Sequence, residues 1–156
     1  ILTGLDARGP AEFLDAVQAL LRLIGPFLPE EWEKPDNPSP AAQRLKPVLS
    51  YLDANFANPE LSLKKLAGVI HLQPTYFSNR FKKIFGTTPI HLLTELRLRH
   101  ARSLLLNTDK TLNEISFCCG YRDQFYFSRV FKKNTGQNPQ QFRKSAGLFG
   151  ARGESV

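Results

Sequence analysis

Apolar residues recur at helical spacing in two stretches of the N-terminal third of the chain. In residues 11–24 they fall three and four positions apart and form one face of a helix, which Gly25-Pro26 ends. A second helix is predicted over Leu45–Phe56, with Pro47 in its first turn, where the missing N–H costs little. Between the two helices, residues 33–41 are rich in Pro and polar side chains, which is typical of a linker.

The pattern of residues 76–89 returns fifty positions later, in residues 126–139. Eight of the fourteen aligned residues are identical, without a gap. Upstream the repeat continues at a shift of forty-nine, where residues 62–66 match residues 111–115, so the second copy has one extra residue in its turn. Two copies at this period indicate a duplicated unit of a few helices, because a solenoid needs more copies to stack.

Each copy is predicted to form a helix, a turn and a second helix. In the first copy Ser62 caps a short helix that ends near Ile70, Pro74 opens the next helix, and Gly86 ends it. The second copy carries the equivalent signals, namely a capping box of Thr111 and Glu114, a stop at Gly120, a cap at Asp123 and a stop at Gly136.

A long helix from Pro89 to about Leu106 joins the two copies, and a final short helix starts at Pro139. Five apolar residues of the long helix are expected to face inward: Leu93, Leu96, Ala101, Leu104 and Leu105. The sequence therefore predicts an all-α fold with two helix-turn-helix subdomains, each a homeodomain-like helical unit, joined by a long linking helix. This part of the chain should contain seven helices, with one helix before it and no strand.

Charge is segregated along the chain, whose formal net charge is +7. Residues 1–61 hold five Lys or Arg against nine Asp or Glu, whereas residues 62–145 hold fifteen against four. This segregation favours a polyanionic partner for the repeats. A basic surface that is simply solvated would give the same distribution, so charge alone leaves both interpretations open.

Several other kinds of protein are disfavoured. The chain has no run of about 18 apolar residues for a membrane span and no signal-peptide pattern at its start. Cys118 and Cys119 are adjacent, cannot build a disulfide framework, and are expected to be buried thiols beside Gly120. The three His residues show no ligand spacing with them, so neither a metal nor a cofactor is expected. No arrangement of carboxylates, phosphate loop or Ser-His-Asp points to catalysis.

The motifs of both copies and of the linking helix resemble the DNA-binding domain of AraC/XylS-type transcription regulators over residues 45–145. The matching positions are Leu66-Ala67, Tyr76-Phe77-Ser78, Phe81-Lys82-Lys83, Gly86, Pro89, Arg97, Ala101, Ile115, Cys119-Gly120-Tyr121, Asp123, Tyr126-Phe127-Ser128-Arg129, Phe131-Lys132-Lys133, Gly136, Pro139 and Phe142-Arg143. Departures are small: Ser116 stands where Ala is usual, and Asn138 where Ser or Thr is common.

The resemblance implies a sequence-specific regulator of double-stranded promoter DNA, more commonly an activator, that also contacts RNA polymerase. Residues 1–38 would be the tail of an upstream sensing or dimerisation domain plus a linker, residues 39–145 the DNA-binding domain, and residues 146–156 a flexible tail. A homodimer would form through the upstream domain, and the protein would be cytoplasmic and nucleoid-associated. The chain contains no Met and starts at Ile1, which indicates a part of a longer protein.

In a helix-turn-helix the second helix lies in the major groove, and its N-terminal residues reach the base edges. The expected inward stripes are Phe77, Phe81 and Ile84 in the first copy, and Phe127, Val130 and Phe131 in the second. The residues predicted to contact bases are Gln73, Thr75, Ser78, Asn79, Gln124, Phe125, Ser128 and Arg129. Arg129 suits guanine O6 and N7, and Asn79 suits adenine.

Phosphate contacts are predicted from cations and from residues at helix N-termini. They are Ser62, Lys82, Lys83, Thr111, Arg122, Lys132 and Lys133. Any single lysine could equally be solvated. Phe125 has two interpretations: it packs on a thymine methyl group, or it tucks against the preceding helix.

Two other functions are weighed against a regulator. A DNA alkyl-repair enzyme carries a similar domain beside a reactive cysteine in a Pro-Cys-His-Arg motif, which this chain lacks. A protein-binding adaptor that no longer binds DNA would lack the polar and basic outward stripes. The sequence therefore favours a transcription regulator and not an enzyme.

Overall fold

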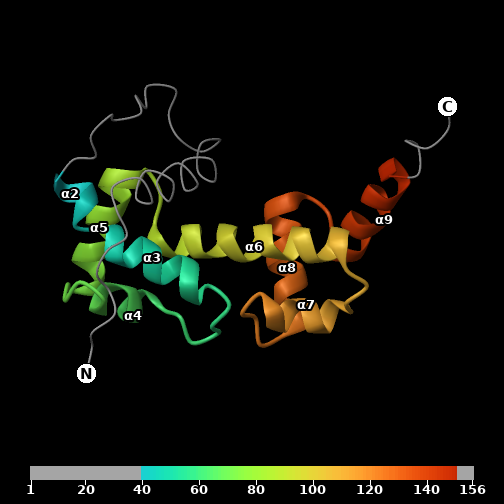
Figure 1. Ribbon diagram of the computed structural model, residues 1–156, viewed down its shortest axis with the longest axis horizontal. Helices are drawn as coiled ribbons and strands as arrows, with labels where there is room; N and C mark the ends of the chain where they lie inside the picture. The colour runs from blue at the N-terminus through green and yellow to red at the C-terminus, as the bar shows by residue number, and fades with distance from the viewer. Residues whose placement is uncertain (1–39, 151–156) are drawn as a thin grey trace, which may run out of the picture. The chain divides into compact units, whose positions relative to one another are not determined.

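The computed structural model describes residues 40–150, with side chains up to residue 145, and its regular structure in this range is entirely α-helical (Figure 1). The helices are α2 (Pro40–Gln43), α3 (Lys46–Asn55), α4 (Leu63–Gly68), α5 (Pro74–Phe85), α6 (Pro89–Asn107), α7 (Leu112–Cys118), α8 (Gln124–Thr135) and α9 (Pro139–Gly150). The all-α prediction is confirmed. The chain divides after Asn37 into two parts, and the described residues belong to the second part. The helix predicted over residues 11–24 lies outside the described residues, as do residues 1–39 and 151–156.

The first helix-turn-helix consists of α4 and α5. The Ser62 hydroxyl accepts a hydrogen bond from the Lys65 N–H at 3.4 Å and caps α4 as predicted. Pro74 opens α5, and Gly86 ends it with φ at 71°, in the left-handed region that an L side chain rarely adopts. The boundaries of this unit therefore follow from its capping residues.

The second helix-turn-helix consists of α7 and α8 and repeats this arrangement. Thr111 and Glu114 form the predicted capping box at the start of α7. The Asp123 carboxylate accepts a hydrogen bond from the Tyr126 N–H at 2.6 Å, and Gly136 ends α8 in the left-handed conformation. Both copies of the repeat thus form a helix-turn-helix with N-caps and C-caps at equivalent helix ends.

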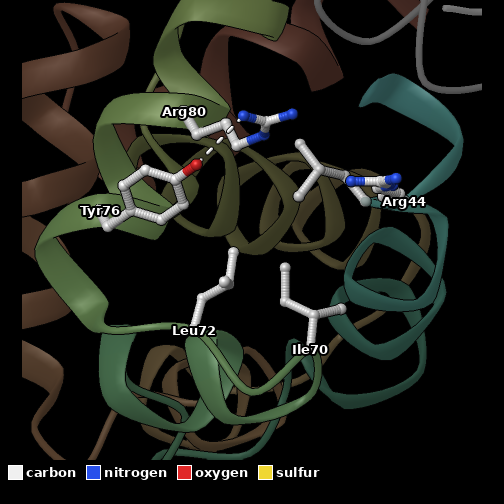
Figure 2. A pocket seen from close by; sticks show the side chains of 6 residues that line it. Arg44, Ile70, Leu72, Tyr76 and Arg80 are labelled. Carbon is white, nitrogen blue, oxygen red and sulfur yellow. Dashed lines mark hydrogen bonds between the residues drawn. The ribbon is translucent and has the colours of Figure 1, made fainter. Parts of the chain in front are cut away.

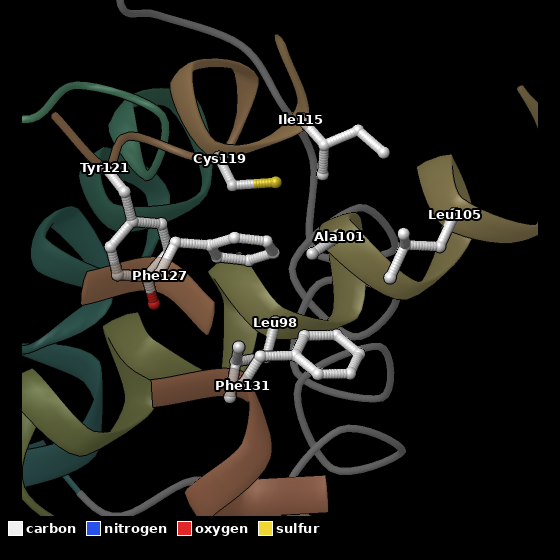
Figure 3. Packing of buried hydrophobic residues seen from close by; sticks show 8 residues of the cluster. All are labelled: Leu98, Ala101, Leu105, Ile115, Cys119, Tyr121, Phe127 and Phe131. Atoms are coloured by element: carbon white, nitrogen blue, oxygen red, sulfur yellow. The ribbon is translucent and has the colours of Figure 1, made fainter. Parts of the chain in front are cut away.

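Helix α6 joins the two units and contacts both, since it packs on α4 and α5 and also on α7 and α9. Figure 3 shows the core around its C-terminal half, where α6 supplies Leu98, Ala101 and Leu105. Phe127 and Phe131 of α8 enter the same cluster with ring centroids 5.8 Å apart, and both are completely buried. Truncating either ring to Ala would cost about 3–5 kcal/mol.

Three packing and boundary predictions are corrected by the structure. Phe85, rather than Ile84, completes the buried stripe of α5, because its ring packs on Phe81 with centroids 4.6 Å apart while Ile84 is half-buried. Helix α2 begins at Pro40, inside the predicted linker, where proline is tolerated in a first helical turn. Helix α9, predicted to be short, has 12 residues and continues to Gly150.

Candidate nucleic-acid interface

The first predicted recognition surface lies on α5. Thr75 and Asn79 are exposed, Ser78 between them is half-buried, and Lys82 follows one turn later in solvent. Phe77 and Phe81 anchor the opposite face in the core. Gln73 at the N-cap position is also exposed and makes no capping hydrogen bond with its side chain. The predicted base-contacting residues of this copy therefore share one accessible face.

The second predicted surface lies on α8 and has a different chemical character. Arg129 is exposed, whereas Gln124 and Ser128 are half-buried. Lys132 again follows in solvent, in the last turn of the helix. The residues of the two surfaces correspond in position, but α5 has the amide of Asn79 where α8 has the guanidinium of Arg129.

Phe125 is 74% exposed, which bears on one of its two interpretations. A ring tucked against the preceding helix would be largely covered, so that interpretation is wrong. An exposed phenyl ring in the first turn of α8 remains free to pack on an apolar group such as a thymine methyl.

Tyr126 and Tyr76, equivalent residues of the two copies, are both 53% exposed, although no surface role was predicted for either. The guanidinium carbon of Arg129 lies 6.0 Å from the centre of the Tyr126 ring, at the outer limit of a cation–π contact. On α5 the Tyr76 hydroxyl instead accepts a hydrogen bond from Arg80 at 3.2 Å. A tyrosine thus lies beside an arginine in each copy, and the repeated Tyr-Phe-Ser motif is the signal that could have identified both tyrosines.

The predicted phosphate contacts differ in how free their side chains are. Lys82, Lys83, Lys132 and Lys133 are exposed in the last turns of α5 and α8. Arg122 is exposed but forms an ion pair with Glu60, which lies in the loop between α3 and α4. Any phosphate would have to compete with that carboxylate.

The helix-capping candidates are already engaged within the protein. The Ser62 hydroxyl caps α4, and Thr111 donates from both its N–H and its hydroxyl to the Glu114 carboxylate, at 2.7 and 2.8 Å. These two hydrogen bonds, the backbone one first, hold the pKa of Glu114 below its ordinary value. The Thr111 N–H therefore already donates to a carboxylate and is not free for a phosphate.

An open pocket, which the sequence did not predict, lies beside α5 (Figure 2). Arg44 and Arg80 lie at its rim, and apolar side chains that include Ile70 and Leu72 line the rest. Arg80 is one residue after Asn79 on α5 but is held by Tyr76. The pocket is therefore beside the predicted recognition surface and not part of it.

The adjacent cysteines have different environments. Cys119 is buried as predicted, and burial raises the pKa of its thiol to about 12. Cys118 is exposed, so the prediction of two buried thiols is wrong for this residue, which lies next to the exposed Phe117 at the end of α7.

Within residues 40–145 no three His, Cys, Asp or Glu side chains gather as a metal site would require. No helix of the described part of the chain is long and apolar enough to cross a membrane.

A family model described as a helix-turn-helix domain matches residues 66–145, just over half of the chain. Among curated proteins, the bifunctional transcriptional activator/DNA repair enzyme AdaA of Bacillus subtilis is 34% identical over 119 residues, 76% of this chain and 56% of AdaA. The raffinose operon transcriptional regulatory protein RafR of Pediococcus pentosaceus is 34% identical over 65% of this chain and 36% of its own length. The chain thus spans between about a third and just over half of these relatives.

This chain covers most of the length of similar chains whose structures are solved. The C-terminal domain of AraT, a response regulator from Geobacillus stearothermophilus, matches 70% of this chain and 88% of its own at 35% identity, with a TM-score of 0.63. A transcriptional regulator with an AraC-type DNA-binding domain from Chromobacterium violaceum matches 68% and 94% at 28% identity, with a TM-score of 0.59. These matches agree with the two-unit architecture described above.

Proposed function

Because the chain belongs to the AraC/XylS family of helix-turn-helix proteins, we propose that it regulates transcription by placing α5 and α8 in two major-groove segments of promoter DNA. One observation carries this proposal: both helices place exposed or half-buried side chains, polar or basic except for Phe125, at corresponding positions on one face. The corresponding pairs are Thr75 and Phe125, Ser78 and Ser128, Asn79 and Arg129, and Lys82 and Lys132. Such faces suit base edges in the first two turns and phosphates in the last.

The roles within this interface follow from side-chain chemistry and freedom. Arg129 and Asn79 are the main readers of base identity, while Gln73, Gln124 and the remaining outward residues of the first turns supply weaker base contacts. The four exposed lysines at the ends of α5 and α8 contribute phosphate contacts that do not depend on sequence. Ser62, Thr111 and Arg122 contribute less, because their side chains are engaged with protein groups.

A binding selection from random duplexes tests the proposal. We expect the protein to enrich two unlike segments at one fixed separation, because the two recognition faces differ. Repeating the selection with Asn79→Ala and with Arg129→Ala should relax preference in one segment each, and Gln140→Ala, exposed on α9, is the matched control. Recovery of unenriched duplexes with the unaltered protein would refute sequence-specific binding.

For the full-length protein we infer RNA polymerase as a second partner and a homodimer formed through an upstream domain. The support is that the relative AdaA is named as a transcriptional activator, and that this chain spans only 56% of AdaA and 36% of RafR. We place the protein in the cytoplasm, on the nucleoid. In-vitro transcription from a selected site tests the first inference, since an activator raises transcript yield at fixed polymerase concentration.

We further infer that this chain is not itself an enzyme, although the relative AdaA is named as bifunctional. A repair cysteine must be a reactive thiolate, whereas burial keeps the Cys119 thiol protonated. Treatment of the native protein with iodoacetamide should modify Cys118, which is exposed, and leave Cys119 unmodified until the protein is unfolded. Native modification of Cys119, or modification of Cys118 much faster than that of a free thiol, would contradict this inference when read by peptide mass spectrometry.

A further inference from the structure

The segment that leads into the first helix-turn-helix touches the second helix-turn-helix directly. The contact joins the loop after α3 to the turn between α7 and α8. Gly120 in that turn packs against the backbone of Ala57, so close that an added Cβ would lie 2.9 Å from the Ala57 carbonyl carbon and oxygen and from the Phe56 oxygen. Gly120 also has φ at 77°. Glycine is required there twice, by its conformation and by the close approach of another segment.

Arg97 of α6 forms hydrogen bonds to the same loop after α3. Its Nε donates to the Phe56 carbonyl and its Nη2 to the Asn58 carbonyl, both at 2.8 Å. The planar guanidinium also lies over the Tyr121 ring, 5.3 Å from its centre. Burial lowers the pKa of Arg97 from its ordinary value, but an arginine remains charged in proteins. One side chain thus links α6, the loop of the first unit and the turn of the second.

Tyr121 connects this contact to the recognition helix of the second unit. It is only 6% exposed, and its ring packs on Phe127 and Tyr126 of α8 with centroids 5.3 and 6.1 Å away. Tyr126 in turn lies beside Arg129. A shift of Tyr121 would therefore move the helix that carries the predicted base contacts.

We propose that Ala57, Arg97, Gly120 and Tyr121 form a joint that fixes α5 and α8 at one separation, so that both helices bind a single duplex together. The proposal rests on the proposed function and makes Arg97 and Gly120 positioning residues for two-segment binding. A helix that carries one unit on each half can still bend or twist between them. The joint removes that freedom, because a second point of contact sets the angle between the units.

The energetic consequence is a gain in affinity for two segments on one duplex. Two linked binding units can exceed either unit's affinity by 10²–10⁴-fold when the linkage matches the separation of their sites, and lose this gain when it does not. The joint should therefore leave binding to a single segment unchanged and should strengthen binding to both segments at the correct separation.

The chain offers a matched pair of glycine variants for the test. Gly120→Ala introduces both a strained backbone and a clash with Ala57, whereas Gly136→Ala, at φ 79°, has the same strain but no atom within 4 Å of its added Cβ. We expect Gly120→Ala to weaken binding to a two-segment duplex by about tenfold or more and to leave single-segment binding within about twofold. Gly136→Ala should match the unaltered protein on both duplexes. Equal two-segment affinities of the two variants would overturn the proposal.

A second measurement needs no DNA and so separates failure of the joint from failure of the proposed function. Spin labels are attached at Lys83→Cys on α5 and Lys133→Cys on α8 in a Cys118→Ser background, and the label-to-label distance is measured by pulsed electron resonance. The unaltered joint should give one narrow distribution, and Gly120→Ala a broader or displaced one.

Should Gly120→Ala fail to fold, Arg97→Lys provides the same readout, since lysine keeps the charge but cannot donate to two carbonyls in a fork. Arg99→Lys, exposed on the same helix, is its control. Distributions that stay as narrow in Arg97→Lys as in Arg99→Lys would overturn the proposal even if the protein binds no DNA at all.

Discussion

The outward residues of α8 offer a duplex two kinds of positive charge. Arg129 is exposed within the first two turns and carries a planar donor fork, whereas Lys132 is exposed in the last turn as a mobile point charge. The fork can bridge two acceptors of one guanine, but an ammonium group near a phosphate carries no sequence information. The two residues should therefore affect binding in distinguishable ways.

Arg129→Ala should weaken binding to the selected duplex by about 1–3 kcal/mol and relax preference at one base pair. Lys132→Ala should weaken selected and random duplexes alike and lower the slope of log affinity against log salt by about one unit. Titrations of both variants at three salt concentrations measure these effects. Equal losses on selected and random DNA for Arg129→Ala would argue against a base contact.

Phe125 is the least expected residue of this surface, because a phenyl ring that is 74% exposed to water gives up the free energy of burial. If it packs on a thymine methyl group, replacing that thymine by deoxyuridine should cost about 0.8 kcal/mol, the value of one buried methylene-sized group. Phe125→Ala should abolish the difference between the two duplexes without lowering the free energy of unfolding. A thymine preference that survives in Phe125→Ala would assign it to another residue.

At the scale of single elements, the capping residues made the helix boundaries predictable. Ser62, Thr111 and Asp123 are side-chain N-caps, and Gly86 and Gly136 end their helices in the left-handed conformation, as their positions in the sequence indicated. Caps act within four residues, so local sequence is sufficient to place them. Phe85 was missed because the inward face of a helix depends on what packs against it.

The capping box at α7 predicts a pH dependence. Hydrogen bonds from Thr111 lower the pKa of Glu114 in the folded protein, so its carboxylate stabilises α7 above the ordinary pKa of a glutamate. This contribution is lost as pH falls through the lowered pKa, where the carboxyl becomes protonated. Glu114→Gln should therefore lower Tm near neutral pH, and the difference from the unaltered protein should disappear in acid. Thermal melts from pH 7 to pH 2 measure it, and a difference that is constant across this range would contradict the mechanism.

At the scale of the molecule, the repeat predicted two similar units, but not how they are held together. Arg97 and Phe56 are 41 residues apart in sequence, and Gly120 and Ala57 are 63 apart, so no local pattern connects them. The same limit applies to Arg122, whose charge predicted a phosphate contact and whose ion pair is with the distant Glu60. Contacts of this kind depend on the packing of the whole fold.

The last prediction concerns the spacing of the two DNA segments. Helix α6 has 19 residues and is about 28 Å long, and successive major grooves on one face of DNA lie about 34 Å apart. With the width of the packed units added, one monomer can reach both grooves of an asymmetric site. If a straight duplex does not fit both helices, the DNA must bend, at a cost of about 1–6 kcal/mol.

Inserting five base pairs between the selected segments turns one of them by about half a helical turn, to the far side of the duplex. Two units at a fixed separation cannot follow, so the affinity should fall to that of a single segment. Inserting ten base pairs returns both segments to one face of the duplex but separates them by about 34 Å more. A rigid joint should not recover binding to both segments on this duplex, whereas a flexible link would. Gel-shift titrations of the three duplexes distinguish these cases. Undiminished affinity after the five-pair insertion would mean that one unit carries the binding and that the other contributes at most sequence-independent phosphate contacts.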